Sequence, residues 1–425
     1  MMTKLNDDCF VLDKDRITHL EALSILQSRV SIAVEREDVP LAKAAGRFLA
    51  DALVSPRPIP AHDNSAVDGY AFAHSDYSKK TVARLIIAGE ASAGHPFQAE
   101  PPPDRAVRIF TGAVMPHGLD TVVMQEDACI ERKDEDTWVL IPPGLKQGAN
   151  RRLAGEDSAA GAVLVNPGTR LRPQEIATAA ATGLDRLRCF APLKVAIFST
   201  GDEILRPGET FSAGKVYDAN AAMLEGLARA AGAEPISLGI LPDSAELVRA
   251  ALLDASRKYH AVVISGGASQ GAEDHVVRSI DALGQRHLWQ IAIKPGRPMS
   301  FGQIGDCVVL GLPGNPVAVF VCFLIYGSPM LTRLAGGAWP EPMRYPLPAS
   351  FTQKKKVGRR EFWRARLMRG HGELRVAKFA RDGSGLISSM READGLIEVG
   401  EEVSEVREGD PVDFIPFTEF GLPPS

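Results

Sequence analysis

The stretch that most constrains the fold of this chain is AVVISGGASQGAED, residues 261–274. Its first four residues, 261–264, are all apolar and predict a strand buried on both faces. The small residues at 265–269 cannot continue that strand and predict a turn in which backbone N–H groups can approach an anion closely. Glu273 and Asp274 suit the start of the next helix. Two interpretations are open: a phosphate-sized pocket, or a tight βα turn that binds nothing.

Segments typical of strands and of helices alternate on both sides of this stretch. The predicted strands are 195–198, 236–240, 261–264, 289–293 and 308–310, and the predicted helices are 221–231, 245–257, 276–283 and one from about 317. Such alternation is typical of βαβ units and predicts a mainly parallel sheet with helices on both faces. Ligands of open parallel sheets bind outside the carboxyl ends of the strands.

The remaining sequence predicts further domains around this α/β domain, which we place at 191–336. Residues 56–149 carry short strand patterns between proline and glycine turns, and 340–425 return to such patterns, which predicts a β-rich domain and a C-terminal β-barrel. Residues 10–55 and 150–190, with helices at 16–34 and 173–181, are expected to form one split N-terminal domain. The expected fold class is therefore α/β multidomain, with a central three-layer α/β/α domain.

Composition indicates a cytoplasmic protein without a nucleic-acid or membrane partner. The net charge of -5 gives no general attraction to nucleic acid or to an anionic membrane. The five cysteines form no CxxC pair, so neither a zinc knuckle nor a disulfide framework is indicated. The N-terminus lacks the apolar segment of a signal peptide, and the longest apolar stretch, 317–326, is too short to span a bilayer.

Carboxylates follow the first three predicted strands of the α/β domain. Glu203 or Asp202, Asp243 and Asp274 are expected at one edge of the sheet, where they would repel each other without a cation. Hard oxygen ligands beside a phosphate favour Mg²⁺ over zinc. Ordinary roles are also open, because Asp243 could simply cap the next helix and Asp202 could close a turn.

Cations and a second glycine turn are expected at the same edge. Lys294 and Arg297 follow the fourth predicted strand and suit a phosphate or another oxyanion, although they could also be solvated charges. Residues 312–316, LPGNP, precede a helix and predict a further anion-binding start. The convergence of these groups favours a functional site.

Three polar stretches outside this edge are ambiguous. DNSAVDGYA at 63–71 predicts either a polar loop or part of a site. The charges at 151–157 are typical of a surface salt-bridge cluster. KKKVGRR at 354–360, the dense basic run, predicts either a solvated hairpin or an anion contact.

Seven motifs, in order, resemble those of the MoeA-type molybdopterin molybdenumtransferases, which are similar to the E domain of gephyrin. The motifs are DNSAVDGYA at 63–71, FTGAVMP at 110–116, RRLAGEDSAAG at 151–161, STGDEI at 199–204, SGGASQGAEDH at 265–275, AIKPGRP at 292–298 and GLPGNPVA at 311–318. The resemblance covers nearly the whole chain. It implies the last step of molybdenum cofactor synthesis, in which molybdate enters adenylylated molybdopterin and AMP is released with Mg²⁺.

The resemblance also implies an elongated homodimer with an active site shared between subunits. Carried over by motif, Asp68 and Thr111 would face the cleft from the partner, and the other catalytic candidates are Glu203, Asp243, Asp274 and Lys294, of which the three carboxylates would hold Mg²⁺. The candidate cofactor-binding residues are Ser265, Gly266, Gly267, Ser269, Arg297, Pro313, Gly314, Asn315, Arg359 and Ser384. Lys294 is expected to offset charge on the leaving AMP.

One position departs from the family pattern. Gln290 stands where the family often has a lysine, and it brings hydrogen-bonding capacity without charge. Two rival functions stay open: a molybdopterin adenylyltransferase, which is similar to residues 193–335 alone, and a non-catalytic scaffold like gephyrin. Expected partners are a second copy of the chain and, further, a molybdopterin adenylyltransferase and proteins that mature molybdoenzymes.

Overall fold

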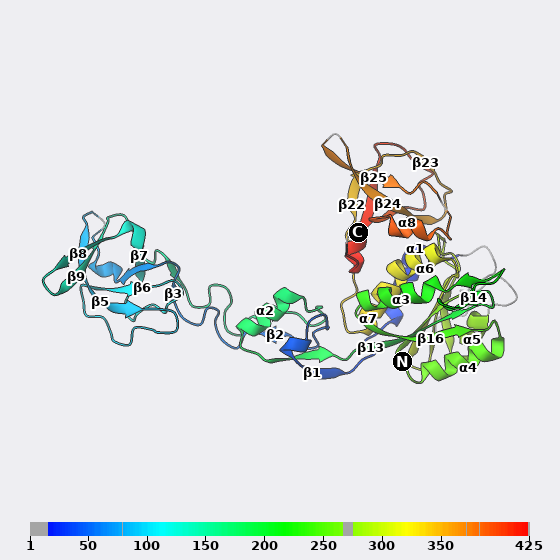
Figure 1. The fold of residues 1–425 in the computed structure, drawn as a ribbon, viewed down its shortest axis with the longest axis horizontal. Helices are drawn as coiled ribbons and strands as arrows, with labels where there is room; N and C mark the ends of the chain where they lie inside the picture. The colour runs from blue at the N-terminus through cyan, green and yellow to red at the C-terminus, as the bar shows by residue number, and fades with distance from the viewer. Residues whose placement is uncertain (1–15, 79, 267–274, 371, 382, 424–425) are drawn as a thin grey trace.

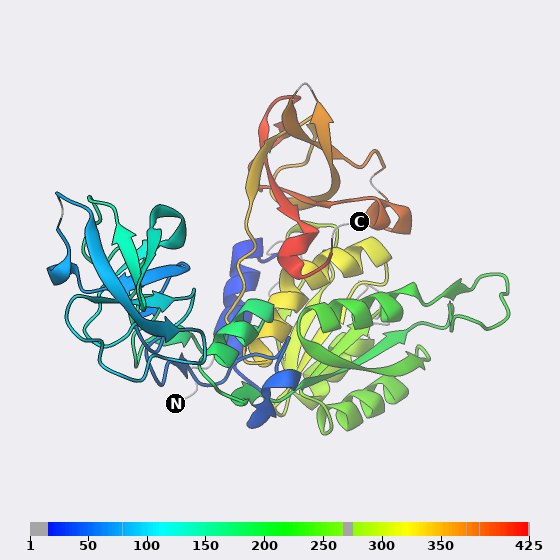
Figure 2. The ribbon, with the colours of Figure 1, turned by 60° about the vertical axis from the view of Figure 1, so that its left-hand side comes forward.

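The structure, a computed structural model, describes residues 16–78, 80–266, 275–370, 372–381 and 383–423. The molecule is elongated, with a β-rich domain at one end, a narrow connecting region in the middle and a larger body at the other end (Figure 1). The larger body contains the α/β domain and, above it in Figure 2, the C-terminal domain. The α/β multidomain fold predicted from the sequence is confirmed.

A six-stranded sheet forms the middle of the α/β domain. Its strand order is β16 (Ala233–Leu241), β13 (Leu193–Thr200), β17 (Ala261–Ser265), β21 (Cys307–Leu312), β20 (Ser300–Ile304) and β18 (Gln285–Trp289). The first four strands are parallel. β20 is antiparallel to both of its neighbours: it forms a tight hairpin with β21, and it also pairs in antiparallel with β18. The predicted sheet is therefore mainly parallel, with a hairpin that the sequence pattern did not reveal.

Helices cover both faces of this sheet, as expected for βαβ units. α3 (Ala219–Ala230) and a long helix at 316–334 pack on one face, and α4 (Ala245–Ser256) and α5 (His275–Leu283) on the other. Neighbouring residues of β13 alternate between these layers: Ile197 packs in the first cluster, and Phe198 in the second. Successive side chains of a strand point to opposite faces, so a continuous apolar run suits this sheet.

The helix at 316–334 is the core of the larger body. It runs continuously through α6 (Pro316–Cys322), the π-helical turn η5 (Phe323–Gly327) and α7 (Ser328–Leu334). The helix is longer than the predicted apolar stretch, and its length and composition alone would suit a membrane span. However, 89% of its apolar window is buried inside the protein, so its hydrophobicity is accounted for by packing.

The β-rich domain is built on a second six-stranded sheet. Its strand order is β7 (Thr121–Met124), β4 (Gly69–Phe72), β6 (Arg105–Ile109), β5 (Ala83–Ala91), β9 (Asp136–Ile141) and β8 (Cys129–Lys133). Apolar side chains are buried on both faces: Phe72 and Val123 on one, and Val107 and Val122 on the other. Short 3-10 turns at η3 (His74–Asp76) and η4 (Gln125–Asp127) complete the domain.

The connecting region is formed by the two segments that flank the β-rich domain. β1 (Arg36–Pro40) pairs with β12 (Arg186–Phe190), β2 (Leu53–Val54) with β11 (Val163–Val165), and β3 (Asn64–Ser65) with β10 (Arg151–Arg152). The 3-10 turn η2 (Leu41–Lys43) and α2 (Pro173–Ala181) pack beside these pairs.

The first helix does not belong to this connecting region. We expected it within the split N-terminal domain, but α1 (His19–Arg29) buries Ala22 and Leu26 in the core cluster of the larger body. The helix period of its apolar residues specified a buried face but not the surface that the face would cover.

The C-terminal domain is a small barrel that takes in a strand from the α/β segment. Its sheet order is β19 (Ile293–Lys294), β24 (Arg360–Gly370), β26 (Gly395–Val399), β28 (Pro411–Pro416) and β22 (Tyr345–Pro348). β25 (Glu373–Lys378) pairs with β24, and a bridge from Ala349 to Val376 closes the circle. The remaining elements are the pair β23 (Gln353–Lys354) and β27 (Glu405–Val406), α8 (Ile387–Arg391) and η6 (Phe417–Phe420).

The strand predicted at 289–293 is therefore wrong in position. β18 ends at Trp289, and β19 pairs in parallel with β24 of the C-terminal barrel instead of with the central sheet.

Candidate functional site

A cavity of about 1010 Å³ opens at the carboxyl ends of the parallel strands. This is the edge at which open α/β sheets bind ligands. Eight of the residues predicted as site residues line the cavity: Glu203, Asp243, Ser265, Gly266, Arg297, Pro313, Gly314 and Asn315. Four different strand ends thus contribute to one hollow, and its size suits a nucleotide-sized ligand.

Two carboxylates stand exposed at the mouth of this cavity. Glu203 lies in the loop after β13, and Asp243 lies in the loop after β16. A hydrogen bond of 3.1 Å from the Asp243 N–H to Asp202 Oδ1 joins these two loops. Asp243 is not the helix cap, because Ser244 holds that position in α4. The sequence left open that Asp243 simply caps the next helix, and this interpretation is wrong.

The third predicted carboxylate, Asp274, lies outside the described residues, as do Gly267 and Ser269. Within the described ranges, no group of three His, Cys, Asp or Glu side chains is close enough to hold a metal ion. Apart from Asp218, which is buried as the cap of α3, the described residues supply two carboxylates in this cavity, and both are exposed. Carboxylate oxygens are the donors that Mg²⁺ prefers, so these two side chains fit that ion.

The glycine turn after β17 is shaped by close backbone packing. Gly266 has φ 95°, and a Cβ at this position would lie 2.4 Å from the carbonyl oxygen of Thr200. A larger residue would collide with the neighbouring strand end, so glycine is required there. Gly266 therefore lies close to the end of β13 and forms part of the cavity lining.

Two site residues were missed in the sequence. Asp218 caps α3 by accepting a hydrogen bond of 3.0 Å from the Ala221 N–H, and both Asp218 and Asn220 line the cavity. Asn220 is buried, and its Oδ1 atom has no hydrogen-bond partner among the residues that the structure describes. A buried acceptor without a partner is costly unless a ligand satisfies it. The available signal was the helix-capping aspartate just before the predicted helix at 221–231.

The two cations predicted to lie together are separated. Arg297 lines the large cavity, whereas Lys294 does not. Lys294 lines two smaller cavities, of about 220 Å³ and about 330 Å³. The two cations are separated because β19, which contains Lys294, leaves the central sheet and pairs with β24. Between the two cations, Gly296 packs so tightly on the core helix that a Cβ there would lie 2.1 Å from Cys322 Sγ.

The three cavities form a row. The large one and the 220 Å³ cavity share Pro298, Pro313 and Asn315, and the 220 Å³ cavity shares Lys294 and Trp363 with the 330 Å³ cavity. Ser384 lines the middle cavity, and Arg359 lines the last. Lys294 thus does not line the large cavity, but it lines both of the smaller cavities in the row.

The helix start after LPGNP offers fewer free donors than expected. Pro316 has no N–H, and the Val317 N–H donates to the carbonyl of Ser384 at 3.0 Å. A loop of the C-terminal domain thus occupies the first available N–H of this helix. Anion binding there would rely on later donors and on side chains.

The last cavity is strongly basic, and we call it the basic cavity. Its lining includes the cationic side chains of Lys294, Lys354, Lys355, Lys356, Arg359 and Lys378. The run at 354–360, for which two interpretations were open, therefore borders a cavity instead of a plain hairpin.

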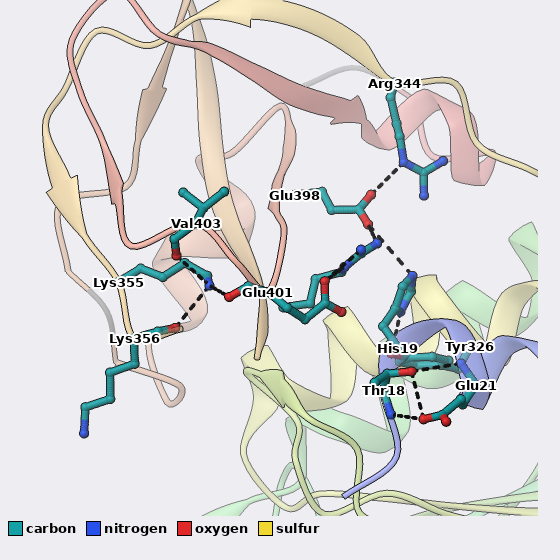
Figure 3. A network of polar contacts seen from close by, with 11 residues as sticks. Thr18, His19, Glu21, Tyr326, Arg344, Lys355, Lys356, Glu398, Glu401 and Val403 are labelled. Carbon is teal, nitrogen blue, oxygen red and sulfur yellow. Dashed lines mark hydrogen bonds and ion pairs between the residues drawn. The ribbon is translucent and has the colours of Figure 1, made fainter. Parts of the chain in front are cut away.

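Not every cation of that run is available to a ligand. Lys355 is buried and donates to the carbonyls of Lys356, Glu401 and Val403 at 3.0–3.2 Å (Figure 3). Burial lowers the pKa of this lysine. Arg360 is paired with Glu398 and Glu401 at 2.6 and 2.9 Å. These two side chains support the structure, while their neighbours face the cavity.

The pairs of Arg360 belong to a buried network that joins the C-terminal barrel to the core (Figure 3). His19 of α1 contacts Tyr326 of the core helix at 2.8 Å, and its other ring nitrogen lies 3.8 Å from Glu398. Burial lowers the pKa of His19 to about 4, against the attraction of Glu398. The histidine is therefore neutral at pH 7. The network holds β24, and with it the paired strand β19, against the core.

Asp68 and Thr111 lie in the β-rich domain, at the opposite end of the molecule from the cavities (Figure 1). Both the N–H and the hydroxyl of Thr111 donate to Asp68 Oδ1 at 2.8 Å. These hydrogen bonds lower the pKa of Asp68, the backbone one most. The pair is organised, but within one chain it is not brought to the other site residues.

Two other predicted features have simple structural positions. Gln290 is buried at the end of β18 with φ 61°, and it does not line any of the three cavities. Arg151 lies 3.5 Å from Asp63, so the charged stretch at 151–157 contacts the start of DNSAVDGYA.

The fold defines a multidomain α/β protein with a row of cavities that starts at the carboxyl edge of its central sheet. Residues 17–183 match the family described as the MoeA N-terminal region (domain I and II), 196–333 match a probable molybdopterin binding domain, and 346–417 match the MoeA C-terminal region (domain IV). The chain is 35% identical over 399 residues to a molybdopterin molybdenumtransferase of Haemophilus influenzae, covering 93% of this chain and 98% of that protein.

The chain is also similar to a gephyrin and to a solved structure. The chain is 30% identical over 355 residues to gephyrin of Dictyostelium discoideum, covering 73% of this chain and 48% of that protein. A molybdopterin biosynthesis moeA protein from Pyrococcus horikoshii OT3 superposes with a TM-score of 0.82 at 28% identity, covering 95% of this chain and all of that one. The chain belongs to the molybdopterin molybdenumtransferase family.

Proposed function

We propose that this chain inserts molybdate into adenylylated molybdopterin and releases AMP in a Mg²⁺-dependent reaction. Family membership makes it an enzyme of molybdenum cofactor biosynthesis. The observation that supports the finer proposal is the row of cavities. Carboxylates stand at one end, cations stand at the other, and the shared residues Asn315 and Lys294 connect them.

The nucleotide and its phosphates are assigned to the large cavity. Its strand ends, the Gly266 turn and the start of α3 suit a phosphate and a base, and Asn220 offers a buried acceptor. Arg297, not Lys294 as first expected, is positioned to offset charge on the leaving AMP, because only Arg297 lines this cavity.

Mg²⁺ would be held by Glu203 and Asp243, with Asp274 as the third predicted ligand. When bound, the ion would polarise the phosphoanhydride and neutralise developing charge. The Asp243 N–H to Asp202 hydrogen bond fixes the loop that carries one ligand. Asp202 thus has a supporting role at the mouth of the cavity.

Molybdate is assigned to the basic cavity. Lys294 and Arg359 are 40% and 33% exposed in their side chains, which leaves both able to contact an oxyanion. Ser384 lines the neighbouring cavity and could donate to the same substrate. The molybdopterin sulfurs would then meet molybdate in the middle cavity, which lies between the two assigned ends.

The chain need not supply a covalent nucleophile, because the sulfurs that receive molybdenum belong to the substrate. The two described cysteines of the α/β domain agree with this reaction. Cys307 and Cys322 are buried in the core, and burial raises the pKa of both thiols, that of Cys307 to about 12. Neither would be a thiolate at pH 7.

We further propose that the active form is a homodimer in which Asp68 and Thr111 complete the site of the partner subunit. Within one chain these residues lie far from the cavities, yet they are held in an organised pair. A second copy would bring this hydrogen-bonded pair to the cavities of its partner. A cytoplasmic location remains a prediction from composition.

AMP release from adenylylated molybdopterin, measured with and without molybdate and Mg²⁺, tests the proposal. We expect release that requires Mg²⁺ and is stimulated by molybdate. Formation of pyrophosphate from ATP and molybdopterin would instead identify an adenylyltransferase. Retention of AMP release in Asp274→Asn would contradict the catalytic role of that carboxylate and favour a scaffold.

A further inference from the structure

We propose that Glu361 is a positioning residue of the basic cavity, which holds Lys294 and Arg359 toward the oxyanion and whose negative charge limits the affinity for it. This inference rests on the proposed function of the cavity as the molybdate site. Glu361 belongs to β24 and lines the basic cavity, yet only 3% of its side chain is exposed. It therefore lies behind the cations that face the ligand.

Both carboxylate oxygens of Glu361 are occupied. Oε1 accepts from Arg359 Nε at 2.9 Å and lies 2.8 Å from Arg359 Nη2. Oε2 accepts from Trp363 Nε1 at 2.8 Å and lies 3.9 Å from Lys294 Nζ. One edge of the guanidinium is thus used, which orients its remaining N–H donors. The ammonium group of Lys294 is attracted but is free to move toward a ligand.

The position of Lys294 is linked to Glu361 through the backbone as well. Lys294 of β19 and Glu361 of β24 are partners in the register of two parallel strands. The side-chain pair therefore starts from adjacent backbone positions. The network around Arg360, one residue before Glu361, fixes the same strand against the core. The carboxylate is thus placed more firmly than either cation.

Among the described residues that line the basic cavity, Glu361 is the sole carboxylate against six cationic side chains. Lys355 is directed to three carbonyl oxygens, and Lys378 donates to the carbonyl oxygen of Phe379 at 3.3 Å. The other four cationic side chains of the lining are Lys294, Lys354, Lys356 and Arg359. A carboxylate in this position keeps the cations together when no oxyanion is bound. It also repels a bound dianion, which must leave the cavity to reach the dithiolene.

Two effects of neutralising Glu361 oppose each other. Loss of its hydrogen bonds would let Arg359 turn away and weaken oxyanion binding, typically by about tenfold for one charge-assisted hydrogen bond. Loss of its charge would strengthen binding, because the Glu361 carboxylate repels both negative charges of a dianion a few ångströms away, and this repulsion is larger at a low effective dielectric. We expect the charge to prevail, because Arg359 and Lys294 remain attracted by the dianion itself.

The test measures molybdate binding to the purified full chain by calorimetry, in the absence of molybdopterin. Glu361→Gln should bind molybdate at least tenfold more tightly than the wild type, or about 1.4 kcal/mol. Glu361→Asp retains the charge and should stay within threefold of the wild type. Glu408→Gln removes an exposed carboxylate that is paired with Arg375 elsewhere in the same domain, so it is the matched control, expected within twofold.

Steady-state AMP release provides a second readout that a purely structural role would not move. Glu361→Gln should lower KM for molybdate and should not raise kcat, because the dianion is stabilised before transfer. If Glu361→Gln does not fold, a tenfold gain in Glu361→Asp would overturn the proposal, and unchanged affinity in that variant would support it.

Unchanged or weaker molybdate binding in folded Glu361→Gln would overturn the inference and leave the proposed function intact. Absence of molybdate binding to the wild type would overturn the inference too. The proposed function itself fails only if AMP release from adenylylated molybdopterin is absent, so the two failures are distinguishable.

Discussion

The side-chain amide of Asn220 donates a hydrogen bond of 2.8 Å to the hydroxyl of Ser265. The same amide lies 2.7 Å from the carbonyl oxygen of Gly314. One buried side chain thus joins the start of α3, the end of β17 and the loop before the core helix. These are three walls of the large cavity, so its shape depends on this residue.

Asn220→Ala is expected to lower the free energy of unfolding by about 1–3 kcal/mol, because two buried hydrogen bonds are lost. It should also weaken AMP binding by roughly tenfold. Chemical denaturation and AMP titration measure the two effects. Asn166→Ala, at an exposed position, is the control. Normal AMP affinity in Asn220→Ala would show that this residue only supports the fold.

Arg297→Ala and Lys294→Ala should separate the two substrates. Since Arg297 lines the large cavity and Lys294 the basic one, the first variant should weaken AMP binding and the second molybdate binding, each by about 10–100-fold. Titration of both ligands into both variants gives the comparison. Equal losses for both ligands in each variant would mean that the cavities do not divide the substrate as assigned.

Glu203→Gln and Asp243→Asn are expected to raise the Mg²⁺ concentration needed for half-maximal AMP release by at least about tenfold, because each removes one charged oxygen ligand. Molybdate binding without Mg²⁺ should be unchanged in both. Asp254→Asn, in an exposed pair with Lys258, is the control carboxylate. Wild-type Mg²⁺ dependence in the two site variants would exclude these residues as ligands.

Mixing two inactive variants tests whether the site is shared. Asp68→Asn changes the β-rich domain, and Asp243→Asn changes the cavity. In a mixed dimer one site would carry both changes and the other neither. Random exchange of subunits should therefore restore roughly a quarter of the wild-type AMP release. A mixture that stays inactive after verified exchange would indicate that each chain forms its own site.

The stability of the protein should depend on pH through His19. Its pKa is lowered by burial to about 4 in the folded protein, from 6.5 as the ordinary value. The unfolded chain binds a proton that the folded chain excludes, so stability is retained above pH 6.5 and falls as the pH drops toward 4. The difference corresponds to roughly 3 kcal/mol.

His19→Gln should remove that part of the acid sensitivity while keeping a polar side chain near Tyr326. Urea unfolding of both proteins at pH 7 and pH 4 measures the change. The variant should lose less stability than the wild type between these two pH values. Equal losses would show that His19 does not control the acid response.

The local pattern predicted much of the α/β domain. The run at 261–264 became the buried centre of the sheet. In the connecting region, α2 covers 173–181 as predicted and begins at Pro173, a residue that suits the first helical position. The hairpin of β20 and β21 was missed. One of its strands follows directly on the segment that leaves the sheet, and a strand of five residues has no unique pattern.

The amino-acid sequence by itself determined which residues could bind an anion and a hard cation. Glu203, Asp243, Ser265 and Asn315 share one cavity because each lies at or just after the end of a parallel strand of the same sheet, and the carboxyl ends of parallel strands meet at one edge.

Tertiary structure alone decided the separation of Lys294 from Arg297. These residues are three apart in the chain, but β19 pairs with a strand that begins at Arg360, so Lys294 faces the C-terminal barrel. Strand pairing over such a separation depends on the packing of whole domains, including the buried network of His19, Glu398 and Arg360. Local spacing carries no information on which distant strand will supply the partner.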